Sequence, residues 1–161
     1  MHVRPFYLSI ILVVTARQSL PVDQTSVLLR EMLSAHNQTR ARANVPPLVW
    51  SVSLATRAQE WANHLLGQTQ FYHRPNSNLG ENLFEIIGGT LSPAEVVGNW
   101  ASEARDYNYR TNSCRGTCGH YTQLVWRTTR EVGCAVARGQ DREVWVCDYG
   151  PPGNWIGERP Y

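Results

Sequence analysis

Two runs of alternating apolar residues near the C-terminus predict a β-hairpin, and a cysteine in each run fixes the register of its strands. The runs span residues 132–137 and 143–149, and a glycine-containing turn at residues 139–142 separates them. With the two central turn residues as the loop, Cys134 lies opposite Cys147 in a non-hydrogen-bonded pair, where side chains approach most closely. We therefore expect a Cys134–Cys147 disulfide across the hairpin.

The start of the chain is typical of a secretory signal peptide. An apolar run from Phe6 to Ala16 follows a short segment with one arginine, and it is shorter than the roughly 20 residues that a membrane span needs. We expect cleavage after Ala16, so that residues 1–16 are a signal peptide and residues 17–161 form one secreted, extracellular domain. The net charge of +2 is too small to indicate a nucleic-acid partner. We expect the domain to be a monomer.

Export also decides how the remaining cysteines are interpreted. The chain has four cysteines, an even number, and oxidising compartments favour disulfides over free thiols. With the hairpin pair assigned, Cys114 and Cys118 are left to pair with each other and close a short loop directly before His120. This second disulfide would restrict the approach of that histidine to its neighbours.

Apolar residues at helical spacing predict three helices. The first covers about residues 23–43 and the second about residues 51–66. The third begins with a capping box formed by Ser92 and Glu95. Together with a further strand expected at residues 81–87, the helices cover both sides of the sheet. The predicted fold is therefore of the α/β class, a three-layer α/β/α sandwich with a small central antiparallel sheet.

Four polar residues from separate segments are candidate site residues: His73, Glu81, Glu103 and His120. Glu103 follows Trp100 by three residues on the third predicted helix, and this spacing turns it toward the core side, where a carboxylate needs a partner. Two imidazoles and two carboxylates can bind a metal, transfer protons or hold a cleft together. The residues alone leave these three alternatives open.

Five motifs carry a resemblance to a known family. In chain order they are HNQTRARANVPPLVW from His36, GENL from Gly80, GHYTQLVW from Gly119, VGCAVA from Val132 and CDYGPPGNWIGERPY from Cys147. Together they resemble the CAP superfamily, which comprises cysteine-rich secretory proteins, antigen-5 venom proteins and pathogenesis-related class 1 proteins. The last motif is most similar to the plant class 1 proteins.

The resemblance implies an α/β/α sandwich with a central cleft lined by His73, Glu81, Glu103 and His120. It also shows one departure, because plant members usually carry six cysteines. This chain lacks both the cysteine expected near residues 68–70 and its usual partner after Ala137. We expect the fold to persist and the segment 66–73, which carries His73, to be more mobile.

Two neutral imidazoles, those of His73 and His120, can share a divalent metal such as zinc, although we expect no cofactor to be required. The sequence contains no HExxH zinc motif and no GxSxG nucleophile elbow, and catalytic residues are not assigned. We therefore expect a binding protein rather than an enzyme. The alternative is a metal-dependent, protease-like hydrolase that uses the same cleft.

The resemblance further implies a sterol or fatty acid as ligand, a role in defence, and transient contact with membrane lipid. Tyr107 and Tyr109, in the polar segment after the third helix, are candidates for the lip of a lipid site. In plant class 1 relatives the terminal segment can be released as an immune peptide, and residues 151–161 match that pattern. The alternative is that this segment is a proline-rich cap packed on the fold.

Overall fold

The computed structural model describes residues 24–161, and the expected signal peptide lies outside this part of the chain. The elements in order are α1 Gln24–Arg42, β1 Val49–Trp50, α2 Val52–Leu66, β2 Gly80–Ile87, α3 Pro93–Ser102, the 3-10 helix η1 Glu103–Arg105, β3 Tyr107–Asn108, β4 Ser113–Cys114, α4 Gly119–Leu124, β5 Glu131–Arg138 and β6 Arg142–Gly150. None of the helices in this range is long and apolar enough to cross a membrane.

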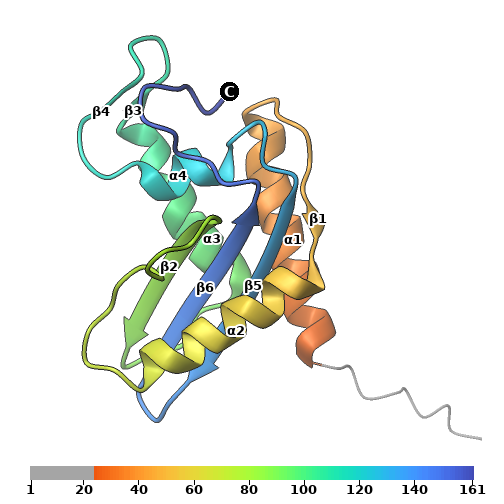
Figure 1. Cartoon of the computed structure of the whole chain (residues 1–161), viewed down its shortest axis with the longest axis vertical. Helices are drawn as coiled ribbons and strands as arrows, with labels where there is room; N and C mark the ends of the chain where they lie inside the picture. Colours follow the sequence, from red (N-terminus) through yellow and green to blue (C-terminus); the bar gives the residue numbers. More distant parts are fainter. Residues whose placement is uncertain (1–23) are drawn as a thin grey trace, which may run out of the picture.

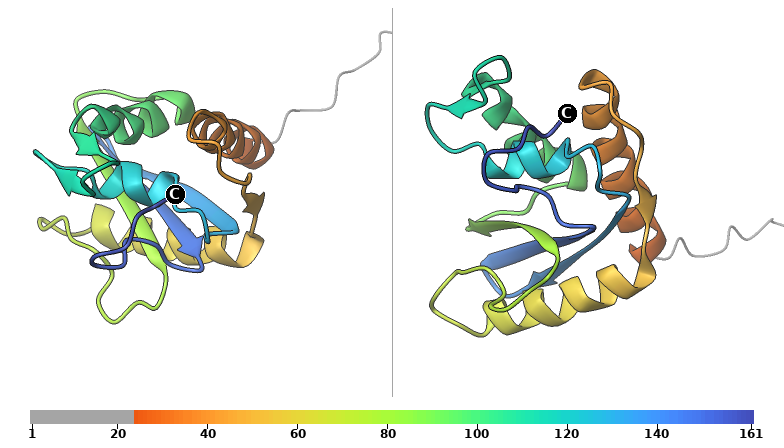
Figure 2. Two further views of the ribbon diagram at one scale, coloured as in Figure 1. Left: turned by 90° about the horizontal axis from the view of Figure 1, so that it is seen from above. Right: turned by 45° about the horizontal axis from the view of Figure 1, so that its top comes forward.

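The expected three layers are present. Helix α2 covers one face of the main sheet, and α1 and α3 cover the other (Figures 1 and 2). Because successive strand residues point to opposite faces, β6 contributes to two separate cores. Trp145 and Tyr149 pack with α1 and α3, whereas Val144 and Val146 pack with α2. Burial on both faces explains the run of apolar residues from Val144 to Cys147 in this strand.

The hairpin at the centre of the sheet has the predicted register. Cys134 is the partner of Cys147 in the β5–β6 pairing, and the two residues form a disulfide with a Cα–Cα distance of 4.1 Å. This short distance is typical of a non-hydrogen-bonded antiparallel pair. The second predicted disulfide, Cys114–Cys118, is also present. Both expected pairings are therefore confirmed.

The sheet is antiparallel from β5 through β6 to β2, as predicted, and a short parallel strand adds to one edge. The strand order is β1-β5-β6-β2, and β1 pairs with β5 in parallel through Val49 N–H to Arg130 O and Ser51 N–H to Val132 O, both at 2.9 Å. A strand of two residues shows no alternation, so the sequence pattern carries no signal for it. The short β3–β4 hairpin went unpredicted for the same reason.

A buried arginine attaches α1 to the segment that follows α4. Arg40 is fully buried, and its guanidinium donates hydrogen bonds to four backbone carbonyls. The acceptors are those of Pro46, Leu124, Trp126 and Thr129. A planar group with five N–H donors suits such a set, since each buried carbonyl at the end of α4 needs a partner. Arg40 thereby fixes the position of α4, which carries His120.

His36 is a packed, hydrogen-bonded residue, as its place on the apolar side of the first helix indicated. The imidazole is fully buried, with Nδ1 2.7 Å from the carbonyl of Met32 and Nε2 2.8 Å from the hydroxyl of Tyr149. Burial lowers the pKa of His36 from 6.5 to about 4. The residue is therefore neutral in the native core and plays a structural part.

Candidate functional site: two histidine–glutamate pairs

The first pair joins the loop before β2 to the strand itself. His73 Nδ1 lies 2.7 Å from Glu81 Oε1, and the same oxygen accepts a hydrogen bond from the backbone N–H of Arg74 at 3.1 Å. The Glu81 side chain is 6% exposed, whereas that of His73 is 64% exposed. The hydrogen bond to Glu81 raises the pKa of His73 above 6.5.

The loop that carries His73 is held against α2 by aromatic and arginine contacts. The guanidinium of Arg74 lies 5.0 Å from the centre of the Trp61 ring and also donates to the carbonyl of Arg57. Tyr72 hydrogen-bonds to His64 at 3.0 Å. Through these contacts α2 holds the residues on either side of His73, so that its imidazole lies next to Glu81.

The start of the same loop is where the sequence lacks the expected cysteine. Here Arg142, the first residue of β6, donates to the carbonyls of Leu66 at 3.4 Å and Gln68 at 2.6 Å and forms an ion pair with Glu85. The guanidinium thus ties the end of α2 to the sheet without a covalent bond. Greater mobility of segment 66–73 stays a prediction.

The second pair joins α4 to the residue that follows α3. Glu103 Oε1 lies 2.7 Å from His120 Nδ1, and Oε2 accepts the backbone N–H groups of His120 at 3.0 Å and Tyr121 at 3.1 Å. Glu103 had been expected on the third helix, but that helix ends at Ser102 and Glu103 begins η1. The tighter 3-10 turn still brings its carboxylate to the start of α4, where free N–H groups favour an anion.

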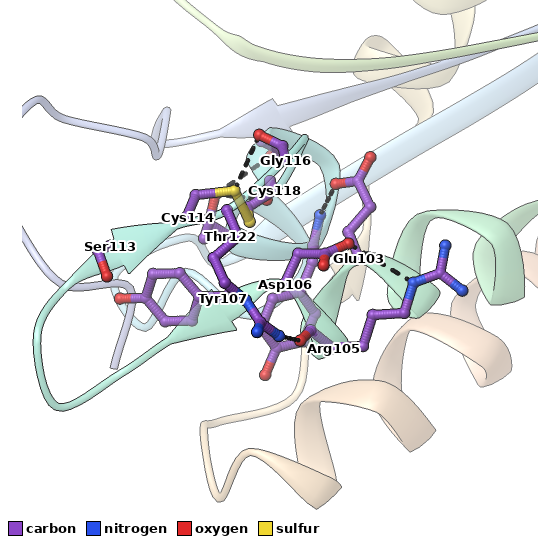
Figure 3. The surroundings of a disulfide bond; sticks show 12 residues. Glu103, Arg105, Asp106, Tyr107, Ser113, Cys114, Gly116, Cys118 and Thr122 are labelled. Carbon is purple, nitrogen blue, oxygen red and sulfur yellow. Dashed lines mark hydrogen bonds and ion pairs between the residues drawn. A yellow bond between two sulfur atoms is a disulfide. The ribbon is translucent and has the colours of Figure 1, made fainter.

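The Cys114–Cys118 disulfide closes the loop that leads into α4 (Figure 3). Cys118 is the residue immediately before the helix, and its carbonyl accepts the N–H of Thr122 at 2.9 Å. Figure 3 shows Glu103 and the disulfide on neighbouring segments beside the start of this helix. The covalent loop and the carboxylate together fix where α4 begins, and hence where His120 lies.

The two pairs lie on elements that touch each other. The side-chain amide of Asn82, next to Glu81 on β2, donates to the carbonyl of His120 at 3.1 Å. Trp100 stacks on the His120 ring with a centroid distance of 6.2 Å and donates to the carbonyl of Leu83 at 3.1 Å. A buried amide and a buried indole therefore connect β2, α3 and α4 between the pairs.

The four candidate residues form two pairs rather than one compact ligand cluster. Within residues 24–161, three potential ligand atoms lie within 4.8 Å of one another in one group, His36 with Cys134 and Cys147. Both sulfurs of that group are in a disulfide, so it offers no thiolate to a metal. Any metal at the histidine–glutamate pairs would need ligands beyond those that the structure brings this close.

One buried carboxylate next to the first pair was not predicted. Asp148 is the register partner of Glu81 in the β2–β6 pairing, and its side chain is 1% exposed. Burial, and then the charge of Glu81, raises its pKa from 3.8 to about 6. Arg57 Nε lies 3.5 Å away, but neither Asp148 oxygen nor Glu81 Oε2 has a hydrogen-bond partner in the described part of the chain. In the sequence, the sign of this site is an aspartate, Asp148, next to a run of apolar strand residues. Its position beside Glu81 follows only from the β2–β6 register.

The hydrogen bonds define which nitrogen of each imidazole is available. A carboxylate only accepts, so Nδ1 of His73 and of His120 carries the hydrogen and Nε2 of the neutral ring carries the lone pair. Neither Nε2 atom is hydrogen-bonded to another group in residues 24–161. The arrangement offers two oriented nitrogen donors, each backed by a carboxylate.

The two tyrosines predicted as a lip have different surroundings. Tyr107 is half-buried, donates to Asn112 Oδ1 at 2.8 Å and lines a surface cavity. Tyr109 is 44% exposed, stacks on Tyr161 with a centroid distance of 4.7 Å and is not among the residues lining that cavity. A lipid-site lip formed by these two residues stays a prediction.

Comparison with known proteins agrees with the fold and the motifs. The profile described as CAP, cysteine-rich secretory protein family, matches residues 33–149, and the chain belongs to this family. Its similarity to plant pathogenesis-related class 1 proteins is also confirmed. Pathogenesis-related leaf protein 4 of Solanum lycopersicum is 44% identical over 135 residues, which cover 82% of each chain.

Other relatives support the same assignment. Pathogenesis-related protein 1 of Arabidopsis thaliana is 41% identical over 133 residues, which cover 82% of this chain and 81% of that protein. Among solved structures, venom allergen-like protein 4 of Schistosoma mansoni is 27% identical and has a TM-score of 0.69. The match covers 83% of this chain and 92% of that one.

Proposed function

We propose that this protein is an extracellular, defence-associated binding protein, and that its two histidine–glutamate pairs hold a divalent cation such as zinc. The defence role is supported by the names of its plant relatives, which are pathogenesis-related proteins. Secretion is supported by its membership of a family described as secretory. The cation site is supported by the geometry of His73 and His120.

One observation carries the cation proposal: both imidazoles donate Nδ1–H to a carboxylate and leave Nε2 free. Histidines that bind metals usually have this arrangement, because the carboxylate fixes the tautomer and makes Nε2 a better ligand. The unpartnered, buried Glu81 Oε2 adds an acceptor beside the first imidazole. When bound, a cation would supply Lewis acidity, while Glu81 and Glu103 orient the rings.

The alternative is a hydrolase that uses the same pairs. A histidine acting as general base for a nucleophile holds the attacking hydroxyl or thiol by hydrogen bond, and Glu103 would then be the orienting group. Glu103 does orient the His120 ring, but in the described part of the chain no hydroxyl or thiol is hydrogen-bonded to Nε2 of either histidine. These contacts favour binding over catalysis.

A second candidate function is binding of a sterol or fatty acid, with transient contact with membrane lipid. It is favoured by a cavity of about 410 Å³ between α1, α3 and β5, whose apolar lining includes Leu28, Pro93, Val136 and Trp145. Four polar side chains, those of Glu31, Gln59, Ser92 and Arg138, also line it, so the cavity offers apolar contacts for a chain or ring and polar groups for a hydroxyl or carboxylate. This ligand is independent of the histidine–glutamate pairs.

Calorimetry of the secreted protein with zinc, and with a sterol, tests both proposals. When His73 and His120 are both replaced by alanine, we expect zinc affinity to fall by more than about 100-fold. Loss of an outer-shell partner alone typically lowers metal affinity by roughly 10–100-fold, and these two residues are the proposed ligands themselves. Sterol binding should be unchanged in that variant. Glu60→Gln, which changes an exposed side chain on α2 outside both pairs, is the control. A hydrolytic activity that disappears in the double variant would instead establish the enzyme.

A further inference from the structure

A surface cavity of about 380 Å³ beside the start of α4 is not explained by the proposed function. Its walls come from the β3–β4 hairpin, the Cys114–Cys118 disulfide, α4 and residues 154–160. Figure 3 shows part of this wall, with the ring of Tyr107 near the disulfide and Thr122. Segments distant in the sequence thus enclose one hollow.

The C-terminal wall of the cavity is firmly attached. The side-chain amide of Asn112 donates to the carbonyls of Gly157 at 3.3 Å and Glu158 at 3.1 Å, and Arg127 N–H donates to the carbonyl of Pro160. A Cβ atom at Gly153 would lie 2.6 Å from the Trp126 ring, so only glycine lets the segment pack this closely. The cavity is therefore preformed rather than created by a loose tail.

The cavity is lined by a single charged side chain, which is acidic. Glu158 is the one charged side chain among its lining residues, and its carboxylate has no partner within residues 24–161. The arginines nearby are directed elsewhere: Arg159 donates to the carbonyls of Tyr109 and Arg110, and Arg115 donates to that of Arg105. The acidic side chain of Glu158 is therefore available to a cation that binds in the cavity.

The uncharged polar groups of the lining are already engaged with one another. Thr122 donates to Asn154 Oδ1 at 2.7 Å, and Asn154 donates to the carbonyl of Gly119 at 2.8 Å. Tyr107 donates its phenol hydrogen to Asn112. These amides and hydroxyls therefore have little left to offer an anion or a sugar, and the aromatic faces and the carboxylate are the main unused recognition groups.

The aromatic part of the lining comes from Tyr107, Trp126 and Trp155. Trp155 is 57% exposed, which is unusual for the most hydrophobic aromatic side chain unless it has a ligand or partner. Indole and phenol faces attract cations, and a quaternary ammonium benefits most because it is weakly hydrated. We propose that this cavity binds a methylated ammonium group, with Trp155 and Tyr107 contacting the methyl groups and Glu158 balancing the charge.

The test is a titration of the secreted protein with choline chloride, followed by tryptophan fluorescence and calorimetry at constant ionic strength. We expect choline binding to be saturable. The neutral molecule of the same shape, 3,3-dimethylbutanol, should bind at least about tenfold more weakly than choline. Glu158→Gln and Trp155→Ala should each weaken choline binding by about tenfold. Both side chains are exposed, so the variants should fold.

Two controls isolate the cavity. Ile156→Ala removes a fully exposed neighbour of Trp155 that does not line the cavity, and Glu60→Gln removes an exposed carboxylate on α2; neither should change binding. If phosphatidylcholine vesicles compete with choline, the natural ligand is a lipid headgroup. If choline binds and the vesicles do not compete, the ligand is a free, soluble ammonium compound. Absent choline binding, equal affinity for the neutral analogue, or an unchanged Glu158→Gln variant would overturn the proposal.

Discussion

Glu103 accepts three hydrogen bonds from one short stretch of chain, and the most telling is the 2.7 Å contact between its Oε1 and His120 Nδ1. The other oxygen accepts the N–H groups of His120 and Tyr121. One carboxylate therefore orients the imidazole and also completes the start of α4. The side chain that serves the site is at the same time a structural cap.

Replacement of Glu103 should therefore affect stability as well as the site. We expect Glu103→Ala to lower the free energy of unfolding by about 2–3 kcal/mol, because charge-assisted hydrogen bonds and the exposed N–H groups of α4 lose their partner. Urea denaturation measures this loss. Glu60→Ala, an exposed glutamate on α2, should change the value by less than about 0.5 kcal/mol. Equal losses in both variants would contradict the capping role.

The buried imidazole of His36 should make the protein less stable in acid. The pKa of His36 is about 4 in the native protein and 6.5 in the unfolded chain. Between pH 4 and pH 6.5 the unfolded chain therefore binds a proton that the native protein does not. We expect this residue to remove about 3 kcal/mol of stability as the pH falls from 6.5 to 4. The loss over that interval should be correspondingly smaller in His36→Phe, and an identical pH dependence would refute this assignment.

Asp148 should act in the opposite direction. Because its pKa is raised from 3.8 to about 6, the native protein binds the proton more readily, and stability from this group increases as the pH falls from 6 to 3.8. We expect Asp148→Asn to be more stable than the wild type by about 3 kcal/mol near pH 7, and most of the gain to disappear near pH 4. Thermal unfolding at both pH values measures it. Asp141→Asn, in the exposed β5–β6 turn, provides the comparison.

The two disulfides should differ in their reaction with thiol reductants. Cys114 is exposed, whereas Cys134 and Cys147 are 2% and 0% exposed in the core of the sheet. We expect mild reduction of the native protein to open Cys114–Cys118 first, since exchange requires access to a sulfur atom. Alkylation followed by peptide mass spectrometry reads the order. Simultaneous labelling of all four cysteines would show that the fold opens globally before either bond is reduced.

The parts of the fold that were predictable depend on local patterns. The capping box of Ser92 and Glu95 is present with both of its hydrogen bonds, and the turn placed Cys134 opposite Cys147. Each of these rests on residues near in sequence or on one hairpin. Local periodicity therefore sufficed for the helices and for the centre of the sheet.

The parts that were missed depend on distant contacts. Asp148 lies opposite Glu81 only because β2 pairs with β6. Three of the four carbonyls that accept hydrogen bonds from Arg40 are more than 80 residues away in the sequence. Neither relationship leaves a periodic trace. Glu103 was placed near the correct face, although the change from α3 to η1 was not visible in the spacing.

The central claim is that Nε2 of both His73 and His120 is free to bind a divalent cation while Nδ1 stays hydrogen-bonded to its glutamate. A zinc titration followed by nitrogen NMR of the imidazole rings tests it most directly. We predict that the Nε2 signals of both residues shift together at one zinc equivalent and that both Nδ1 atoms remain protonated. Zinc-induced shifts at Nδ1, or no shift of either ring, would contradict it.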